Sequence, residues 1–497
     1  MRKVWRGRPG RRAAGLAALT GVLAAAGQAP LGWWWLALPA YAALVWQVVR
    51  AGRGGAWIAW IAGAGHFAAA LNWIVEPFLI EPLVHGWLIP FAVIGLSGGL
   101  ALFWGAAGWV TGRFGLGGLG FAVALTLAEM ARGVVLTGFP WALPGHVWIG
   151  WAPAQVAALV GQNGLTLLTL LAAAGLAALR PWPVLAALAL VGGAFGFGAW
   201  RLEQPDPAPR DITLRLIQPN AEQHLKWDPE RARVYFDRQL ALTAEGARPD
   251  LTIWPETAVP YILEDYPQVA DMIAAAGRGA PVALGVQRVE DAASGDWRVW
   301  NSLVVLGAGA ERLAVYDKHH LVPFGEYIPF GDLAYDLFGL RAFAAQVGGG
   351  YSAGAAPAVI DLGPELGRVQ PLICYEAVFP ALLRATGQRA DWILQITNDA
   401  WFGVWTGPFQ HFALARLRAV EQGLPLVRVA NTGVTAVIDA RGRVLAELPM
   451  GVADKLDTVL PAALPATPYA RWGEWPVLLL LGGLGLLAIR RRGSGRA

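Results

Sequence analysis

Long apolar stretches dominate the first 200 residues of this chain and recur near its end. Seven cover residues 13–29, 31–49, 56–75, 83–110, 115–136, 152–179 and 182–200, and an eighth, shorter one runs from Pro476 to Ile489. A helix needs about 20 apolar residues to cross a bilayer, and Trp472 and Trp475 can anchor the start of the last stretch at the interface. The sequence therefore predicts an α-helical membrane domain with about eight transmembrane helices, seven before a polar insertion and one after it.

Composition agrees with a membrane protein, because 56% of the residues are hydrophobic and only 15% are charged. The net charge of +4 is unevenly placed: residues 205–460 carry 22 basic and 30 acidic side chains, a balance of −8, and the rest of the chain carries +12. The basic excess therefore surrounds the apolar stretches, where membrane topology accounts for it. The insertion is acidic, which argues against nucleic acid as a partner.

Arginine occurs in alternate connections between the apolar stretches. The connections near residues 50–53, 113, 180 and 490–492 contain it, whereas 28–31, 76–82 and 137–151 contain neither Lys nor Arg. The positive-inside rule then predicts a cytoplasmic N-terminus and puts residues 205–460 on the opposite side. In a bacterial inner membrane that side is the periplasm.

Two details of the membrane part allow other interpretations. The basic N-terminus and the run Ala13–Ala29 also resemble a secretory signal, but an uncleaved first span is preferred because further spans follow at once. Arg132 fits the topology poorly. Glu129 lies three residues before it, so the two side chains can pair on one helix face, and an ion- or lipid-binding role for Glu129 stays open.

The pattern changes after a polar, Pro-rich linker at 201–210. Short apolar runs then alternate with helical segments, which predicts an α/β domain at 211–465. A membrane domain at 1–200, a final transmembrane helix at 472–490 and a basic cytoplasmic tail at 491–497 complete the expected organisation. The expected helices are 231–245 and 407–422, and the expected strands are 212–217, 251–254, 282–286, 302–306, 313–316, 369–374, 392–396, 426–429 and 435–438.

Cys374 is the only cysteine among 497 residues, which excludes an intramolecular disulfide and a cysteine-based zinc cluster. It follows the apolar run Arg368–Ile373, and a segment that can open a helix comes after it. A thiol between a strand and a helix meets backbone N–H groups that favour its thiolate. The residue alone leaves two interpretations open, a nucleophile or a small buried hydrophobe.

Two further reactive side chains also follow apolar strands. Glu256 comes after Leu251–Trp254, with Pro255 fixing the backbone, and partial burial would raise its pKa as a general base requires. Helix capping is the alternative role for this carboxylate. Lys318 follows Leu313–Tyr316, where its charge would stabilise a thiolate or an oxyanion.

A pair of histidines, His319 and His320, comes directly after Lys318. Adjacent histidines invite a metal interpretation, but a metal site also needs a third ligand at a recognisable spacing, and the sequence offers none. We therefore expect no metal site here.

The motifs Trp254-Pro255-Glu256, Asp317-Lys318 and Ile373-Cys374-Tyr375-Glu376 resemble the Glu-Lys-Cys triad of the nitrilase superfamily. With the flanking apolar stretches, the whole chain resembles the bacterial apolipoprotein N-acyltransferase family, the membrane-embedded branch of that superfamily. The resemblance implies a nitrilase-like (carbon–nitrogen hydrolase) αββα sandwich for the α/β domain. Further phrases that carry it are Gln218-Pro219-Asn220, Lys226-Trp227-Asp228, the segment 318–329 and the segment 397–403.

The resemblance also implies a mechanism. Glu256 would be the general base for Cys374, and Lys318 would stabilise tetrahedral intermediates together with the backbone N–H of Tyr375. Cys374 would take an acyl chain from a phospholipid, typically phosphatidylethanolamine, as a thioester. The N-terminal amine of a diacylglyceryl-cysteine apolipoprotein would then accept the chain, which completes lipoprotein maturation by ping-pong transfer without metal or organic cofactor.

Four more residues match family positions that support catalysis or contact substrate: Trp227, Glu326, Tyr375 and Glu376. Structural alternatives remain for two of them, since Trp227 can be a core residue and Glu376 can be a partner of Lys318.

Two other functions use the same residues differently. A membrane-anchored amidase of the nitrilase type would release ammonia from a small amide with the same triad, but it would not need about eight spans. A transporter or scaffold would not need the triad, and its function would survive Cys374→Ala.

Residues 333–357 are apolar and Gly-rich, which suggests an arm that dips into the lipid. Replacing Phe338, Leu340 and Phe343 with Ser should therefore slow acyl transfer in membranes while leaving the thiol reactive. Parallel assays of transfer and of thiol alkylation measure this, and unchanged turnover of the triple variant would remove the arm hypothesis.

Overall fold

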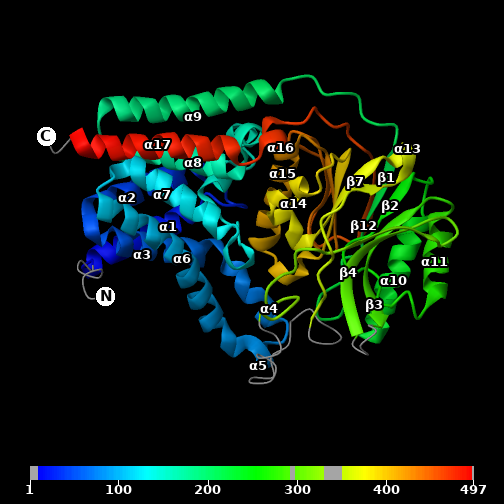
Figure 1. Cartoon of the computed structure of the whole chain (residues 1–497). Helices are drawn as coiled ribbons and strands as arrows, with labels where there is room; N and C mark the ends of the chain where they lie inside the picture. The colour runs from blue at the N-terminus through cyan, green and yellow to red at the C-terminus, as the bar shows by residue number, and fades with distance from the viewer. Residues whose placement is uncertain (1–8, 292–296, 330–349, 495–497) are drawn as a thin grey trace. The chain divides into compact units, whose positions relative to one another are not determined.

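The structure is a computed structural model that describes residues 9–291, 297–329 and 350–494. Two compact units make up the chain (Figure 1). A helical unit contains Met1–Pro205, Trp405–Glu421 and Ala466–Ala497, and a sheet unit contains Asp206–Val404 and Gln422–Pro465. Phe338, Leu340 and Phe343 of the expected arm lie outside the described residues.

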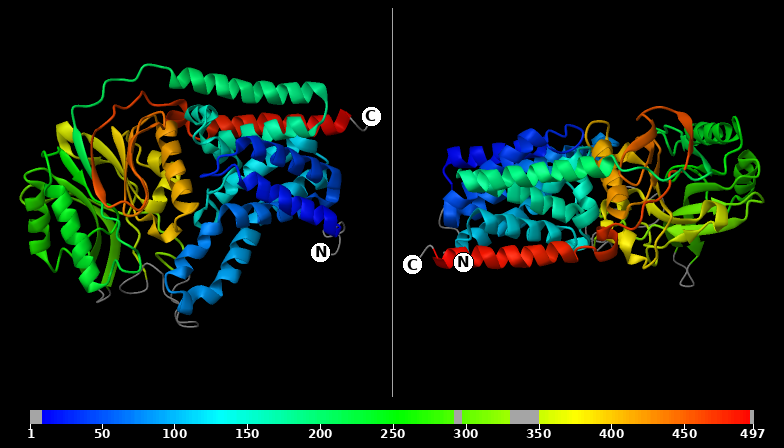
Figure 2. Two further views of the ribbon diagram at one scale, coloured as in Figure 1. Left: turned by 180° about the vertical axis from the view of Figure 1, so that it is seen from behind. Right: turned by 90° about the horizontal axis from the view of Figure 1, so that it is seen from above.

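The helical unit carries helices at all eight apolar stretches. Short helices lie between them at Glu76–Leu79 (α4) and Pro82–His85 (α5), and 3-10 turns lie at 52–54, 72–75, 86–88, 135–137, 144–148 and 152–156. Figure 2 shows α9 running beside α8, and the two helices pack against each other. The eight helices are α1 (Arg11–Ala25), α2 (Trp34–Ala51), α3 (Gly55–Ala70), α6 (Ile89–Phe114), α7 (Gly117–Arg132), α8 (Ala157–Ala177), α9 (Pro181–Leu202) and α17 (Trp475–Ser494).

Fewer than eight of these helices are long and apolar enough to cross a bilayer on their own. Within the described residues three segments qualify, at 82–114, 152–177 and 181–202, and a bent pair at 34–70 and 72–79 can supply a fourth. Helices α1, α3 and α7 have 15 or 16 residues, short of the roughly 20 that a perpendicular span needs. Eight spans therefore remain a prediction.

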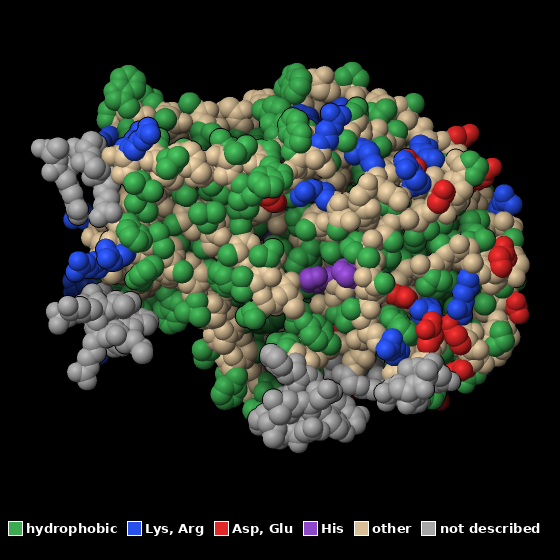
Figure 3. All heavy atoms as spheres, in the orientation of Figure 1, with side chains coloured by type: hydrophobic (Ala, Val, Ile, Leu, Met, Phe, Trp, Pro, Cys, Tyr) green, Lys and Arg blue, Asp and Glu red, His purple; other side chains and the backbone are tan. Residues whose placement is uncertain are grey.

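Apolar side chains cover the surface of the helical unit. Leu83, Trp87, Phe91 and Ile94 around α5 and the start of α6 are all more than 60% exposed. On the face drawn in Figure 3, hydrophobic side chains dominate this unit, and most of the acidic ones lie over the sheet unit. A surface of this kind fits a lipid environment better than water.

Buried polar contacts inside the helical unit join its members. Arg132 Nε donates to Glu129 Oε2 over 2.9 Å, which confirms the expected pairing. The Trp104 indole also donates to Glu129, and Arg132 Nη2 donates to the Trp141 carbonyl over 3.0 Å. The pair is thus compensated on several sides, as burial of charge requires.

Helix α15 (Gly407–Gln422) was expected inside the α/β domain, but nearly all of it groups with the helical unit. The indoles of Trp73 and Trp141 both donate to Gln410 Oε1, over 3.2 and 2.7 Å. Near the other end of α15, Glu421 Oε1 accepts from the backbone of Gln162 over 2.9 Å. These hydrogen bonds explain why α15 groups with the helical unit. The spacing of apolar residues in the sequence does not predict them.

The sheet unit contains two six-stranded sheets. The first has the order β12-β1-β2-β3-β4-β5, with strands Thr213–Gln218 (β1), Leu251–Ile253 (β2), Val282–Asp291 (β3), Trp297–Leu306 (β4), Arg312–Asp317 (β5) and Asp454–Val459 (β12). The second has the order β11-β10-β9-β8-β7-β6, with strands Ile360–Asp361 (β6), Arg368–Ile373 (β7), Trp392–Thr397 (β8), Leu426–Ala430 (β9), Thr435–Ile438 (β10) and Val444–Leu448 (β11). In each sheet the central strands β1–β3 or β7–β9 are parallel, and the remaining pairs are antiparallel.

The two sheets face each other across one core. Leu216 and Ile253 of the first sheet and Trp392 and Leu394 of the second belong to the same buried cluster. Alternate side chains such as Ile217 point to the opposite face of the first sheet, because strand side chains alternate. The α/β architecture expected for this region is confirmed.

Helices cover that outer face of the first sheet. They are α10 (Pro229–Ala244) and α11 (Pro267–Gly277), which contribute Phe236 and Ile273 to a second buried cluster. Asp228 caps α10 by accepting from the Arg231 amide over 3.1 Å, and Pro229 opens the helix without needing an amide donor. Shorter helices are α13 (Gly363–Leu366), α14 (Pro380–Ala385) and, in the helical unit, α16 (Pro468–Trp472).

Trp392→Ala should destabilise the sheet unit by about 3–5 kcal/mol, because its fully buried ring sits in the inter-sheet core and its indole donates to the Leu366 carbonyl. The midpoint temperature for thermal unfolding of the whole chain in detergent should fall by roughly 10 °C. Trp297→Ala, at a ring that is 65% exposed, is the matched control and should change little. Equal shifts in the two variants would contradict this packing.

Candidate active site

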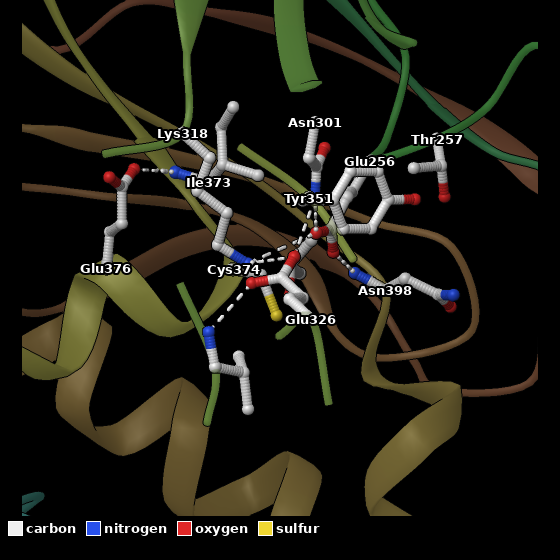
Figure 4. Close-up of polar contacts among 12 residues, drawn as sticks. Glu256, Thr257, Asn301, Lys318, Glu326, Tyr351, Ile373, Cys374, Glu376 and Asn398 are labelled. Atoms are coloured by element: carbon white, nitrogen blue, oxygen red, sulfur yellow. Dashed lines mark hydrogen bonds and ion pairs between the residues drawn. The ribbon is translucent and has the colours of Figure 1, made fainter. Parts of the chain in front are cut away.

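The structure brings together the three strand-end residues that the sequence singled out (Figure 4). Glu256 stands three residues after β2, Lys318 directly after β5 and Cys374 directly after β7. Lys318 Nζ lies 3.6 Å from Glu256 Oε1, and both charges act on the Cys374 thiol. The first two come from one sheet and the third from the other, so the face-to-face sheets assemble the group.

The nucleophile candidate occupies a strained position. Cys374 has φ of 52°, in the left-handed region that non-glycine residues avoid at a cost of about 1–3 kcal/mol. The side chain of Glu376 supports this turn, because its Oε2 accepts from the Ile373 amide over 2.8 Å. The Thr397 side chain forms a hydrogen bond with Cys374. The strand-to-turn change therefore fixes where the sulfur lies.

Glu256 is buried and held on both carboxylate oxygens. Oε1 accepts from Asn301 Nδ2 over 2.7 Å, and Oε2 accepts from the backbone N–H of Asn398 over 2.8 Å. This carboxylate contacts Lys318, and it is close enough to Cys374 for its charge to raise the pKa of the thiol. It can accept a proton there, which suits a general base better than the helix-capping alternative.

Lys318 has a closer partner than Glu256. Its Nζ donates to Glu326 Oε1 over 2.8 Å, and Glu326 Oε2 accepts from the Val322 amide over 2.9 Å. Asn301 Nδ2 donates to Glu326 Oε1 as well, over 3.1 Å, so one amide bridges both carboxylates. Glu326 therefore orients the lysine.

Glu376 interacts with Lys318 through charge, as the sequence left open, but its hydrogen bonds go to other residues. Its Oε1 accepts from the backbone of His319 and His320 and from the Tyr316 hydroxyl, over 2.9, 3.1 and 2.9 Å. Together with the Ile373 amide these donors satisfy the carboxylate, and they tie the turn after β5 to the turn after β7. Glu376 thus fixes the positions of these two turns, which carry Lys318 and Cys374.

Electrostatics put the resting sulfur in its thiol form. Burial raises the pKa of Cys374, and the Glu256 carboxylate raises it further, whereas Lys318 opposes both. Burial alone would lower the pKa of Lys318, but Glu326 and Glu256 outweigh it and hold the pKa above its ordinary value. The lysine is therefore a permanent cation, and the thiol must lose its proton to a base before it attacks.

The remaining expected residues lie around this centre. Tyr375 follows the nucleophile, and its ring contacts Phe379 at a centroid distance of 4.9 Å. Trp227 lines a pocket with Lys226, Tyr235, Glu256 and Thr257, which places it beside the base rather than in the inter-sheet core.

The two adjacent histidines contact residues that surround the site. His319 Nδ1 contacts the Gly354 carbonyl over 2.7 Å, and the His320 ring lies 3.9 Å from that of Phe379. Across the described part of the chain, no three His, Cys, Asp or Glu side chains gather as metal ligands would.

Comparison with known proteins bears on this arrangement. Residues 214–464 match the carbon-nitrogen hydrolase family, and residues 20–175 match the N-terminal domain of apolipoprotein N-acyltransferases. An apolipoprotein N-acyltransferase of Caulobacter vibrioides is 39% identical over 475 residues, which cover 90% of this chain and 88% of that protein. One of Allorhizobium ampelinum is 36% identical over 503 residues, 95% of each chain. The chain belongs to the apolipoprotein N-acyltransferase family.

Solved structures share less with this family member. A crystal structure of an amidase from Nesterenkonia sp. is 18% identical, with a TM-score of 0.37, and covers 56% of this chain and 98% of that one. A CN-hydrolase superfamily protein from Xanthomonas campestris is 23% identical, also with a TM-score of 0.37, and covers 54% of this chain and 97% of that one.

Sequence reasoning missed several residues of this N-acyltransferase family site. Asn301 lies inside β4, where one amide among strand residues gives no signal. Asn398 and Lys226 stand inside motifs that carried the resemblance, but no role was assigned to them. The Tyr351 hydroxyl accepts from Gln287 Nε2 over 2.5 Å. It is close enough to Glu326, Glu256 and Lys318 for their charges to act on its pKa.

Lys318→Met should slow alkylation of Cys374 by iodoacetamide about tenfold or more at pH 8, because loss of the cation raises the thiol pKa further. The pH–rate curve should move toward higher pH. Intact-protein mass spectrometry follows the reaction cleanly, since the family member has one cysteine.

Lys455→Met on β12 is the control for this variant, since Lys455 pairs with Glu245 and Asp457 instead. It should alkylate like the parent chain. An unchanged rate in Lys318→Met would show that this ammonium does not act on the sulfur.

Proposed function

We propose that this chain moves an acyl chain from a phospholipid to the N-terminal amine of diacylglyceryl-cysteine apolipoproteins. The observation that carries the proposal is the full-length similarity to proteins named apolipoprotein N-acyltransferase, which covers the helical and the sheet region together. The geometry of Glu256, Lys318 and Cys374 supports it, because a base, a cation and a thiol are what acyl transfer through a thioester needs.

The first half-reaction would load the sulfur. Glu256 takes the thiol proton, and the Cys374 sulfur attacks the ester carbonyl of the donor. The oxyanion that forms is stabilised by the Lys318 ammonium and the Tyr375 amide. Collapse breaks the ester C–O bond, and the proton on Glu256 passes to the leaving lysophospholipid, which leaves an acyl thioester on Cys374.

The second half-reaction would remove the acyl chain from the sulfur. The α-amine of the apolipoprotein attacks the thioester carbonyl, and Glu256 accepts a proton from the amine. The C–S bond then breaks, and Glu256 passes this proton to the leaving sulfur, which regenerates the Cys374 thiol. The product is an N-acylated, triacylated lipoprotein. No metal or organic cofactor is needed in either half, because proton transfer and charge stabilisation come from side chains.

A bacterial inner membrane is the proposed location, with the catalytic domain at 211–465 facing the periplasm. The apolar surface of the helical unit and the distribution of arginine in its connections support this orientation. Both substrates are lipids, so the site must open toward the outer leaflet. Phosphatidylethanolamine is the proposed donor.

The test is mass spectrometry of the intact chain after incubation with phosphatidylethanolamine and no acceptor. A hydroxylamine-labile gain of one acyl chain should appear and should be absent in Cys374→Ala. Glu264→Gln, at a carboxylate bound to Arg312, is the matched control and should be acylated like the parent.

Adding a diacylated lipopeptide with an N-terminal cysteine should then remove the adduct and yield the triacylated peptide. Absence of the adduct in bilayers, together with ammonia release from small amides, would replace this function with that of an amidase.

A further inference from the structure

A second buried lysine lies beside the proposed base. The chain contains only four lysines among its 39 basic residues, Lys3, Lys226, Lys318 and Lys455. Two of them, Lys226 and Lys318, are buried at the site, at 6% and 1% exposure. Other buried cations of the sheet unit are arginines, such as Arg215 and Arg428. Lysine is a compact charge whose pKa shifts readily on burial, so its selective use here points to the site's chemistry.

Lys226 is bonded to the turn that carries Glu256. Its Nζ donates to the Thr257 hydroxyl over 2.6 Å and to the Glu256 carbonyl over 3.2 Å. The ammonium also lies 5.7 Å from the centre of the Trp227 ring. One side chain therefore contacts the base's own backbone, the next residue and an aromatic ring that lines the same pocket.

That turn needs support because it is strained and tightly packed. Thr257 has φ of 45°, a left-handed conformation that a β-branched residue strongly disfavours. Gly285 of β3 lies against it, and a Cβ at 285 would stand 2.5 Å from the Pro255 carbonyl oxygen and 2.6 Å from Glu256 Cα. Strand β3 thus holds Pro255, Glu256 and Thr257, and Lys226 holds the last two of them.

Lys226 adds a second cation beside the carboxylates of the site. Lys318 lies closer to Glu326 than to Glu256, so Glu256 shares that cation. Lys226 and Glu256 also interact electrostatically: burial lowers the pKa of Lys226 to about 8, and the Glu256 charge opposes this. Between pH 5 and 7 Lys226 is therefore positive. Tyr235 is the other titratable group among the residues that line the pocket.

We propose that Lys226 is a positioning residue for the general base, because its two hydrogen bonds fix the strained Glu256–Thr257 turn that carries the base. The proposal rests on the proposed function in one respect, that Glu256 acts as the base. Without those hydrogen bonds the Glu256 carboxylate is less well placed to take the Cys374 proton, and misplacement of a reacting group slows the reaction.

The test is the rate at which p-nitrophenyl acetate, a donor that needs no lipid, acylates Cys374. Release of p-nitrophenolate gives the rate, and intact mass confirms one acetyl group. In Lys226→Met, which lacks both hydrogen-bond donors, the rate should fall about tenfold or more.

Conservative variants separate the hydrogen bonds from general packing. Lys226→Gln and Lys226→Arg keep donors for the Glu256 carbonyl and the Thr257 hydroxyl, so both should fold like the parent and recover most of its rate. The Lys455→Met rate should equal that of the parent.

A parent rate in Lys226→Met, or a rate in folded Lys226→Gln as low as that of Lys226→Met, would overturn the proposal. A parent chain acylated by the ester but not by phospholipid would end the proposed lipid donor and leave the Lys226 result standing. A parent chain whose Cys374 takes no acyl group from either donor would overturn both.

Discussion

Compensation of a buried ammonium is the constraint on which the sheet unit depends. Lys318 is 1% exposed, and burial of an unpaired charge costs several kcal/mol even after relaxation. Glu326 and Glu256 offset that cost, and Asn301 ties the two carboxylates together. These residues come from separate strands and loops, so the carboxylates compensate the ammonium only if the sandwich holds those strand ends together.

The same physical rule organises the helical unit with different partners. Glu129 and Arg132 neutralise each other inside it, and Gln410 accepts from two indoles. A segment that begins in the polar insertion is thereby joined to apolar helices through hydrogen bonds that lipid cannot replace. Helix α15 is thus specified by a few polar atoms, whereas its neighbours are specified by long apolar stretches.

The sequence could predict features with strong local signals. Apolar runs predicted most of the strands, and the positions directly after these runs predicted Glu256, Lys318 and Cys374 as site residues. Edge strand β12, with the sequence Asp-Lys-Leu-Asp-Thr-Val, looks like a polar loop until it pairs with β1. Asn301 gained its role from the register of β4 with β5, which no single segment encodes. Span number depends on helix length, and composition alone does not fix where α1 or α7 ends.

The solitary, buried sulfur has a consequence for oxidative damage. An oxidised cysteine is usually rescued when its sulfenic acid condenses with a neighbouring thiol to form a disulfide. Cys374 has no second cysteine anywhere in the chain to condense with. Its protection must therefore come from exclusion of oxidants by burial and from its raised pKa, which keeps the oxidisable thiolate scarce between turnovers. A sulfur that escapes this protection depends on an external reductant before the reaction proceeds to the irreversible sulfinic acid.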